Sequence, residues 1–175
     1  MNYYIDIKLK RVARQSVLMN ELVHRLHLAL VKTGLNSIGV SYPNYGVTLG
    51  DTLRIHGTKA DLERLQSVKW ANDSATDIQP VPEHSKHAIF SRVRSNLSTS
   101  KLRRLAKRKQ LSQQDKKEYK IKMLQSGLDL PFLELRSGST GKIYQQHISV
   151  CNVDCEQCGT FDTFGLSKNA SVPIF

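Results

Sequence analysis

The side chain best suited to proton transfer in this sequence is His27. It lies in the stretch LVHRLHLAL, whose apolar residues recur at helical spacing, and it falls at the border between the apolar face and the solvent face. His24 falls further round, toward the exposed side. Histidine titrates near neutral pH, so it can act as a general base toward a hydroxyl group. A border histidine is more often structural than catalytic, and the sequence leaves both roles open.

A turn rich in hydroxyl groups occurs in the segment RSGSTGK, which begins at Arg136. It fails as a phosphate-binding P-loop, because Arg136 stands where that motif needs glycine and a strand rather than a helix is expected to follow. The turn offers the hydroxyls of Ser137, Ser139 and Thr140 together with free backbone N–H groups. It could hold a phosphate or a sugar hydroxyl, and the alternative is an ordinary hairpin.

The segment HISVCNVDCEQC contains four candidate zinc ligands, which are His147, Cys151, Cys155 and Cys158. Their spacing matches no common zinc finger, and all four would lie in one hairpin. The alternative is three reduced cysteines at a loop tip, because an odd, clustered number argues against a disulfide framework. We therefore predict no bound metal and no cofactor.

The strongest charge feature is the run from Lys86 to Lys122. It holds 13 lysines and arginines against two acidic residues, a local balance of +11 that equals the net charge of the whole 175-residue chain. At its centre, KLRRLAKRK has the spacing of a helix with an apolar seam on one side and cations on the other. The cations are Lys101, Arg103, Arg104, Lys107 and Arg108. A solvated helix face is the alternative, but the scarcity of acidic residues and the abundance of arginine favour a nucleic-acid partner.

The elements that must position these residues fall into two halves, and the predicted fold class is α+β. Residues 1–83 show the order βαββαβ, with a half-buried first strand, which is the ferredoxin-like arrangement. Strands are expected near 3–9, 37–42, 53–56 and 76–81, with helices from about 16 and after Thr58. Residues 84–175 predict a C-terminal α/β domain that carries the arginine-rich helix. Its expected parts are an extended segment 87–95 with Arg92 and Arg94, a second helix opened by Ser112, and strands near 130–136, 143–150 and 171–175.

The sequence also bears on where the protein works. No apolar run reaches the 18 or more residues of a membrane span, and MNYYIDIKLK has charges where a signal peptide needs an apolar core. We therefore expect a soluble cytoplasmic protein without a membrane partner.

Several segments together resemble the CRISPR repeat-processing endoribonuclease of the type I-F subtype. They are YYIDIKLK, LVHRLHLAL, SIGVSYP, LRIH, SRVRS with its basic helix, LPFLELRSGSTG, FGLSK and VPIF, in order through nearly the whole chain. The resemblance implies a protein that binds the hairpin of a CRISPR repeat and cuts at the 3′ base of its stem. It also implies that the protein stays attached to the RNA beside other subunits of a type I-F interference complex.

The resemblance assigns roles to individual residues. His27 matches the catalytic histidine that acts on the 2′-hydroxyl upstream of the cut. Ser137 matches the serine that holds that ribose, with Ser139 and Thr140 beside it. Arg92 matches an arginine that reads a guanine edge, and Tyr144 stands where the family has a stacking phenylalanine. The family has a helix that follows the major groove of the stem, and the residues that match it here are Arg103, Arg104, Lys107 and Arg108.

Three features depart from the family pattern. Phe164 stands where the family often has a tyrosine near the histidine, so no phenolic hydroxyl can orient His27. Arg94 stands where well-known members have glutamine, which predicts a second guanine contact. The cysteine-bearing loop has no counterpart. The main alternative function is a non-catalytic RNA-hairpin-binding subunit; a DNA-binding regulator is disfavoured because no helix-turn-helix pattern stands out.

Overall fold

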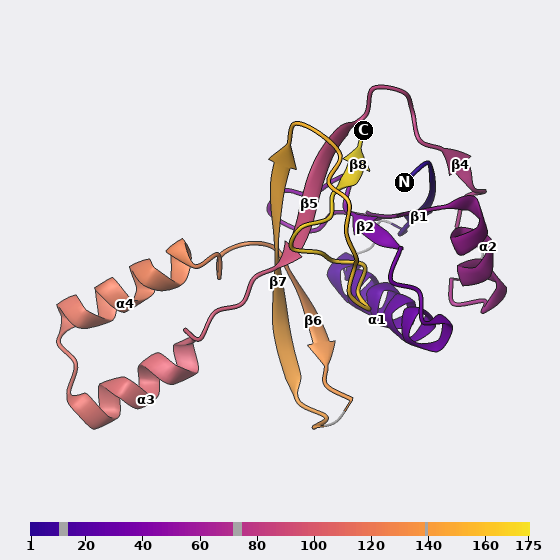
Figure 1. The fold of residues 1–175 in the computed structure, drawn as a ribbon. Coiled ribbons are helices and arrows are strands. Elements are labelled where there is room, and N and C mark those ends of the chain that lie inside the picture. Colours follow the sequence, from indigo (N-terminus) through magenta and orange to yellow (C-terminus); the bar gives the residue numbers. More distant parts are fainter. Residues whose placement is uncertain (11–13, 72–74, 139) are drawn as a thin grey trace.

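A computed structural model gives the fold and describes residues 1–10, 14–71, 75–138 and 140–175. The chain is a mixed α/β protein with two four-stranded antiparallel sheets, ordered β2-β3-β1-β4 and β6-β7-β5-β8 (Figure 1). The elements are β1 (Tyr3–Lys8), α1 (Gln15–Thr33), β2 (Gly39–Ser41), β3 (Thr52–Gly57), α2 (Lys59–Ser67), β4 (Gln79–Pro80), β5 (Lys86–Arg92), α3 (Thr99–Lys109), α4 (Gln113–Gln125), β6 (Phe132–Arg136), β7 (Ile143–Val153) and β8 (Val172–Ile174).

The two helices of the first half form where the sequence predicts them. The apolar face of α1 is buried through Met19, Leu22, Val23, Leu26, Ala29 and Leu30. The helix ends at Gly34, whose φ of 68° is left-handed and whose N–H donates to the Leu30 carbonyl. Thr58 caps α2, because its hydroxyl accepts the Asp61 N–H at 3.2 Å. The predicted starts of both helices and the predicted end of α1 are thus confirmed to within a residue or two.

Several strands differ in length from the prediction, and two of these differences have a clear cause in the pairing. The strand expected near 76–81 is limited to Gln79–Pro80, with a single bridge between Ala75 and Ile7 before it. The pairing is interrupted between Ala75 and Gln79, because the step from Ile7 to Tyr4 on β1 spans three residues and the step opposite it spans four, which leaves one residue without a partner in the ladder. In contrast, β7 runs three residues beyond its predicted end, because its ladder with β5 continues to the pair His87 and Val153.

The strand β3 and the centre of β1, from Ile5 to Ile7, are buried on both faces, whereas the alternation of β1 predicts a half-buried strand. Every residue of β3 is buried, and Asp6 of β1 is only 9% exposed. The second face is covered by C-terminal segments: a Cβ on Gly39 would lie 2.4 Å from a methyl of Val172 and 2.8 Å from the Phe161 ring. The buried side chains of both halves consequently form one continuous core.

A buried ion pair explains how charged residues fit into this covered face. Arg54 donates from Nε and Nη2 to the two carboxylate oxygens of Asp6, at 2.7 and 2.9 Å, and from Nη1 to the Phe175 carbonyl at 2.8 Å. This bidentate geometry offsets the cost of removing both charges from water. On the same strand, burial lowers the pKa of His56 to about 3, so its ring is neutral beside the Ser41 hydroxyl at 2.8 Å.

The helices α3 and α4 form a hairpin that projects away from both sheets (Figure 1). Ser98 caps α3 by accepting the Lys101 N–H at 3.1 Å, and Ser112 with Asp115 forms a capping box at α4. Leu102, on the apolar seam of α3, is 8% exposed, and α3 contacts α4. The predicted division into a docked seam and a cationic outer face is therefore confirmed. Neither these helices nor any other described helix is long and apolar enough to cross a lipid bilayer.

Candidate functional site

His27 and Ser137 line the same surface hollow, which has a volume of about 390 Å³. Arg92, Tyr144 and Phe164 line it as well. These residues come from α1, the end of β5, the β6–β7 hairpin and the loop between β7 and β8. The structure thus brings together four residues that the sequence proposed for the site, although they are up to 117 positions apart in the sequence.

The hydroxyl-rich segment is the turn of the β6–β7 hairpin, as predicted. The Ser137 N–H donates to the Lys142 carbonyl at 2.9 Å, and its carbonyl accepts the Gly141 N–H at 2.8 Å. The Ser137 hydroxyl accepts the Thr140 N–H at 3.3 Å, which fixes the serine at the start of the turn. Thr140 is exposed and is not among the described residues that line the hollow. Ser139 lies outside the described residues.

Arg92 and Tyr144 stand on neighbouring strands beside His27. The Arg92 guanidinium carbon lies 5.7 Å from the centre of the Tyr144 ring, within range of a cation–π contact. The strand β5 ends at Arg92, earlier than the extended segment 87–95 that the sequence predicts, so Arg94 lies beyond the ladder. The chain turns there, because the Ser95 hydroxyl accepts the Leu97 N–H at 3.1 Å. The residues that follow lead into α3.

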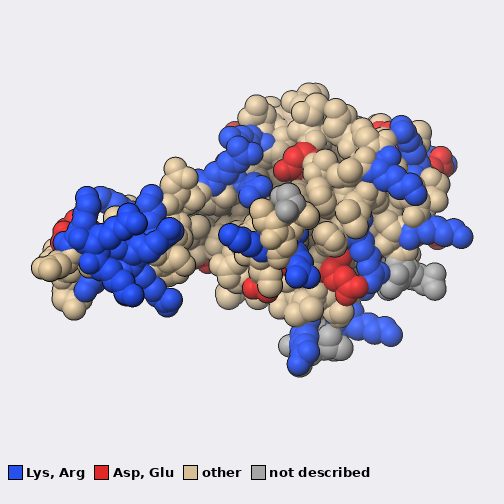
Figure 2. All heavy atoms as spheres, turned by 90° about the horizontal axis from the view of Figure 1, so that it is seen from below, with Lys and Arg blue, Asp and Glu red and all other residues tan. Residues whose placement is uncertain are grey.

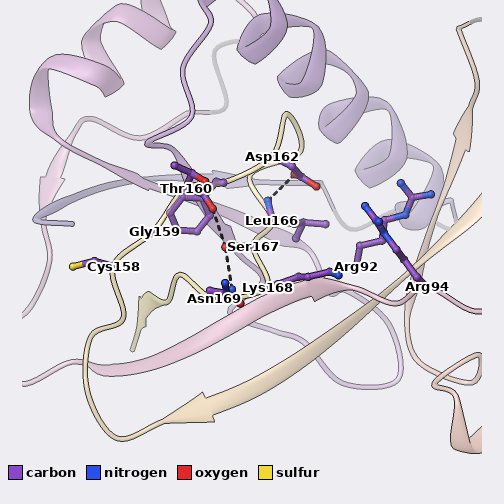
Figure 3. Close-up of a pocket in the computed structure, with 11 residues that line it drawn as sticks. Arg92, Arg94, Cys158, Gly159, Thr160, Asp162, Leu166, Ser167, Lys168 and Asn169 are labelled. Atoms are coloured by element: carbon purple, nitrogen blue, oxygen red, sulfur yellow. Dashed lines mark hydrogen bonds between the residues drawn. The ribbon is translucent and has the colours of Figure 1, made fainter.

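A second hollow, of about 560 Å³, shares Arg92 with the first and is also lined by Arg94 and Lys168 (Figure 3). Its wall is the loop between β7 and β8. Ser167 stiffens that wall, since its hydroxyl donates to the Thr160 carbonyl at 2.8 Å. In the sequence, GLSK contributes only to the family resemblance, and no pattern indicates that Lys168 would lie as a third cation beside the two arginines.

The cations of α3 form a dense basic surface on the projecting hairpin (Figure 2). The predicted residues are all exposed: Lys101, Arg103, Arg104, Lys107 and Arg108. Arg92 and Arg94 line a further hollow that reaches Ser98, the residue that caps α3. Positive side chains therefore extend from the His27 hollow to the basic helix, a distribution that attracts a polyanion.

The loop between β7 and β8 holds the His27 ring from two sides. Its Nδ1 lies 3.1 Å from the Thr163 carbonyl oxygen, and its ring stacks on Phe164 with centroids 4.1 Å apart and planes 5° apart. The neighbouring His24 ring is 6.5 Å away and more exposed. In the sequence, Phe164 stands out only because it lacks the hydroxyl of a tyrosine. No pattern in the sequence indicates the contact between His27 and the Thr163 carbonyl.

Comparison with known proteins identifies the family. A model of the family described as CRISPR-associated protein (Cas_Csy4) matches residues 4–175. The chain belongs to this family. The chain is 35% identical to a CRISPR-associated endonuclease Cas6/Csy4 of Pseudomonas aeruginosa (strain UCBPP-PA14) over an alignment 188 positions long, which covers all of both proteins. It is 30% identical to a CRISPR-associated endonuclease Cas6/Csy4 of Escherichia coli (strain UTI89 / UPEC), again over the whole of both.

A distant likeness to a solved structure extends over most of the chain. The CRISPR endoribonuclease Cse3 bound to a 19-nucleotide RNA aligns with 98% of this chain, and the alignment covers 99% of that one. The identity is 15% and the TM-score 0.39, so no residue of this Cas_Csy4 family member is assigned from it.

The cysteines of this Cas_Csy4 family member do not assemble with His147. All three thiols are exposed, whereas His147 is buried and its Nδ1 lies 2.8 Å from the Leu130 carbonyl oxygen. Over residues 1–10, 14–71, 75–138 and 140–175, no group of three or more His, Cys, Asp and Glu side chains is placed to hold a metal ion.

Proposed function

We propose that this protein is an endoribonuclease that cuts precursor CRISPR RNA at the 3′ base of the repeat hairpin without a metal ion. It then stays bound to the mature guide RNA within a type I-F interference complex. The observation that carries the proposal is the hollow shared by His27, Ser137, Arg92 and Tyr144, beside a basic helix. Family membership and the two relatives named as CRISPR-associated endonucleases support it.

The chemistry follows from the groups in the hollow. RNA carries its own nucleophile, the 2′-hydroxyl, so cleavage requires a base for its proton and a ribose held for in-line attack. His27 takes the proton, the 2′ oxygen bonds to the adjacent phosphorus, and the bond to the 5′ oxygen breaks. That oxygen takes a proton from water. Ser137 holds the ribose, and the products are a 2′,3′-cyclic phosphate and a 5′-hydroxyl.

The two halves of the chain contribute different parts of the proposed RNA site. Residues 1–83 form a ferredoxin-like domain, supported by the sheet order β2-β3-β1-β4, and contribute His27. Residues 84–175 form the RNA-binding domain. Its helix α3 contacts the phosphates of the stem, because the deep major groove of paired RNA hides most base edges. Arg92 and Arg94 read bases at the stem base, and Tyr144 stacks against the terminal base pair.

The phosphate-binding role of α3 is tested with Arg103→Ala, whose native side chain is exposed on the basic surface. Loss of one phosphate contact should weaken hairpin binding and lower the slope of log K against log salt by about one. Binding is measured between 50 and 300 mM salt, roughly the range over which such contacts are screened. The matched control is Lys59→Ala at the exposed start of α2, which should leave the slope unchanged. An unchanged slope for Arg103→Ala contradicts the assigned contact.

The activity itself is tested by incubating the protein with a labelled repeat hairpin in excess EDTA. We expect one cut at the 3′ base of the stem and an upstream product that ends in a 2′,3′-cyclic phosphate. A bound but intact hairpin, with or without added Mg²⁺, would instead identify a non-catalytic RNA-binding subunit. Preference for duplex DNA over the hairpin in competition would favour a DNA-binding protein.

A further inference from the structure

The turn from Asp162 to Leu166, which we call the histidine-holding turn, is rigidly built. The Asp162 carboxylate accepts the N–H groups of Phe164 and Leu166 at 2.8 and 3.0 Å. The Asp162 N–H donates to the Leu166 carbonyl at 2.8 Å, and the Gly165 N–H donates back to the Asp162 carbonyl at 2.9 Å. These bonds fix the direction of the intervening Thr163 carbonyl.

The turn is also anchored to the first sheet. The Val40 N–H of β2 donates to the Gly165 carbonyl at 2.9 Å. Gly165 has a φ of 70°, and a Cβ there would lie 2.5 Å from a methyl of Val40, so only glycine fits this close approach. Phe161, just before the turn, is buried and donates its N–H to the Asn36 carbonyl at 2.9 Å. The turn therefore has a fixed position relative to α1.

The contact with His27 defines which ring nitrogen carries the proton. A backbone carbonyl oxygen only accepts hydrogen bonds, so the Nδ1 that lies 3.1 Å from the Thr163 oxygen must be the donor. A neutral imidazole has one N–H, which leaves Nε2 with a lone pair. The parallel Phe164 ring, 4.1 Å away, holds the plane of the imidazole while Thr163 sets its rotation.

We propose that the histidine-holding turn positions His27 as the Nδ1–H tautomer, with Nε2 ready to accept the 2′ proton of the RNA. The turn acts through His27 and touches no reacting atom itself. It uses a peptide carbonyl and an aromatic ring, so orientation needs no hydroxyl on Phe164. This inference rests on the proposed nuclease function, because a tautomer matters only if His27 transfers a proton.

The first test is spectroscopic and uses the full-length protein without RNA. Long-range ¹⁵N–¹H correlation distinguishes a protonated ring nitrogen from an unprotonated one, and His27→Ala assigns the His27 signals by their loss. We expect protonated Nδ1 and unprotonated Nε2 in the neutral ring of the native protein. Phe164→Ala should give a mixture of tautomers, whereas Phe164→Tyr keeps the stacked ring and should restore the native pattern. A native ring protonated on Nε2 overturns the proposal.

The second test measures single-turnover cleavage at saturating protein. Phe164→Ala should be about tenfold slower than the native protein, because the base is no longer oriented, while its hairpin affinity is unchanged within about twofold. Phe164→Tyr should recover the native rate. A second pair of variants changes the turn itself. Asp162→Ala removes the carboxylate acceptor and should slow cleavage, whereas Asp162→Asn keeps an acceptor oxygen and should recover most of the rate.

The two readouts together separate positioning from general stability. A slower Phe164→Ala enzyme with an unchanged His27 tautomer would overturn the proposal, and so would a native rate. Failure of the nuclease function itself appears differently, as native-rate cleavage by His27→Ala or as no cleavage by the native protein. The tautomer of the free protein is measured independently of either result.

Discussion

His27→Ala is expected to slow cleavage of the repeat hairpin by about a thousandfold while changing hairpin affinity by less than about twofold. Loss of a positioned general base accounts for a decrease of this order. Binding should survive, because the cations proposed to attract the RNA lie on β5, the segment after it and α3, outside the helix that carries His27. Alanine is also the best helix former, so α1 itself should be unaffected. Single-turnover rates at saturating protein and equilibrium binding titrations measure the two effects separately.

The matched comparison for this variant is His24→Ala. His24 lies one turn earlier on α1 and borders the same hollow, but its ring is more exposed and stacks on no aromatic side chain among the described residues. We expect this change to leave most of the cleavage rate, within about fivefold. If His24→Ala abolished cleavage and His27→Ala did not, the assignment of the base would be reversed. Native cleavage by both variants would remove the histidines from the mechanism.

The parts of the fold that follow from local chemistry could be predicted from the sequence. The period of apolar residues places α1, Gly34 ends it, and capping residues open α2 and α4. The cationic face of α3 is equally local, because its residues are three or four positions apart on one helix. The hairpin with Ser137 follows from a turn between two alternating segments. None of these inferences requires knowledge of distant contacts.

The contacts that complete the site are long-range, and the sequence pattern does not contain them. His27 and the Thr163 carbonyl are 136 residues apart, and any residue type at position 163 would supply the same carbonyl. The second face of the first sheet, on which Asp6 and Arg54 lie, is buried rather than solvent-facing, and the sequence does not predict this for a related reason. Polar residues at every second position read as solvent-facing, but here Asp6 and Arg54 neutralise each other beneath the C-terminal strand.

Replacing the 2′-hydroxyl at the cut site with hydrogen should block cleavage by the native protein. In the proposed reaction this hydroxyl is the nucleophile, so a hairpin with one deoxynucleotide there lacks the attacking group. The expected loss exceeds about a thousandfold, whereas affinity should fall by about twofold at most, because most contacts go to phosphates and base edges. Product formation from labelled RNA over hours, at saturating protein, is the measurement.

This substitution distinguishes the proposed reaction from hydrolysis by an activated water. A water nucleophile would attack the phosphorus whether or not the ribose carried a hydroxyl, so the deoxy substrate would be cut and would leave no cyclic phosphate. The control is a hairpin with its single deoxynucleotide one position further upstream, which should be cut at close to the native rate. If the deoxy substrate is resistant and the control is not, the attacking oxygen belongs to one ribose, and His27 and Ser137 have the position expected of the groups that activate and hold it.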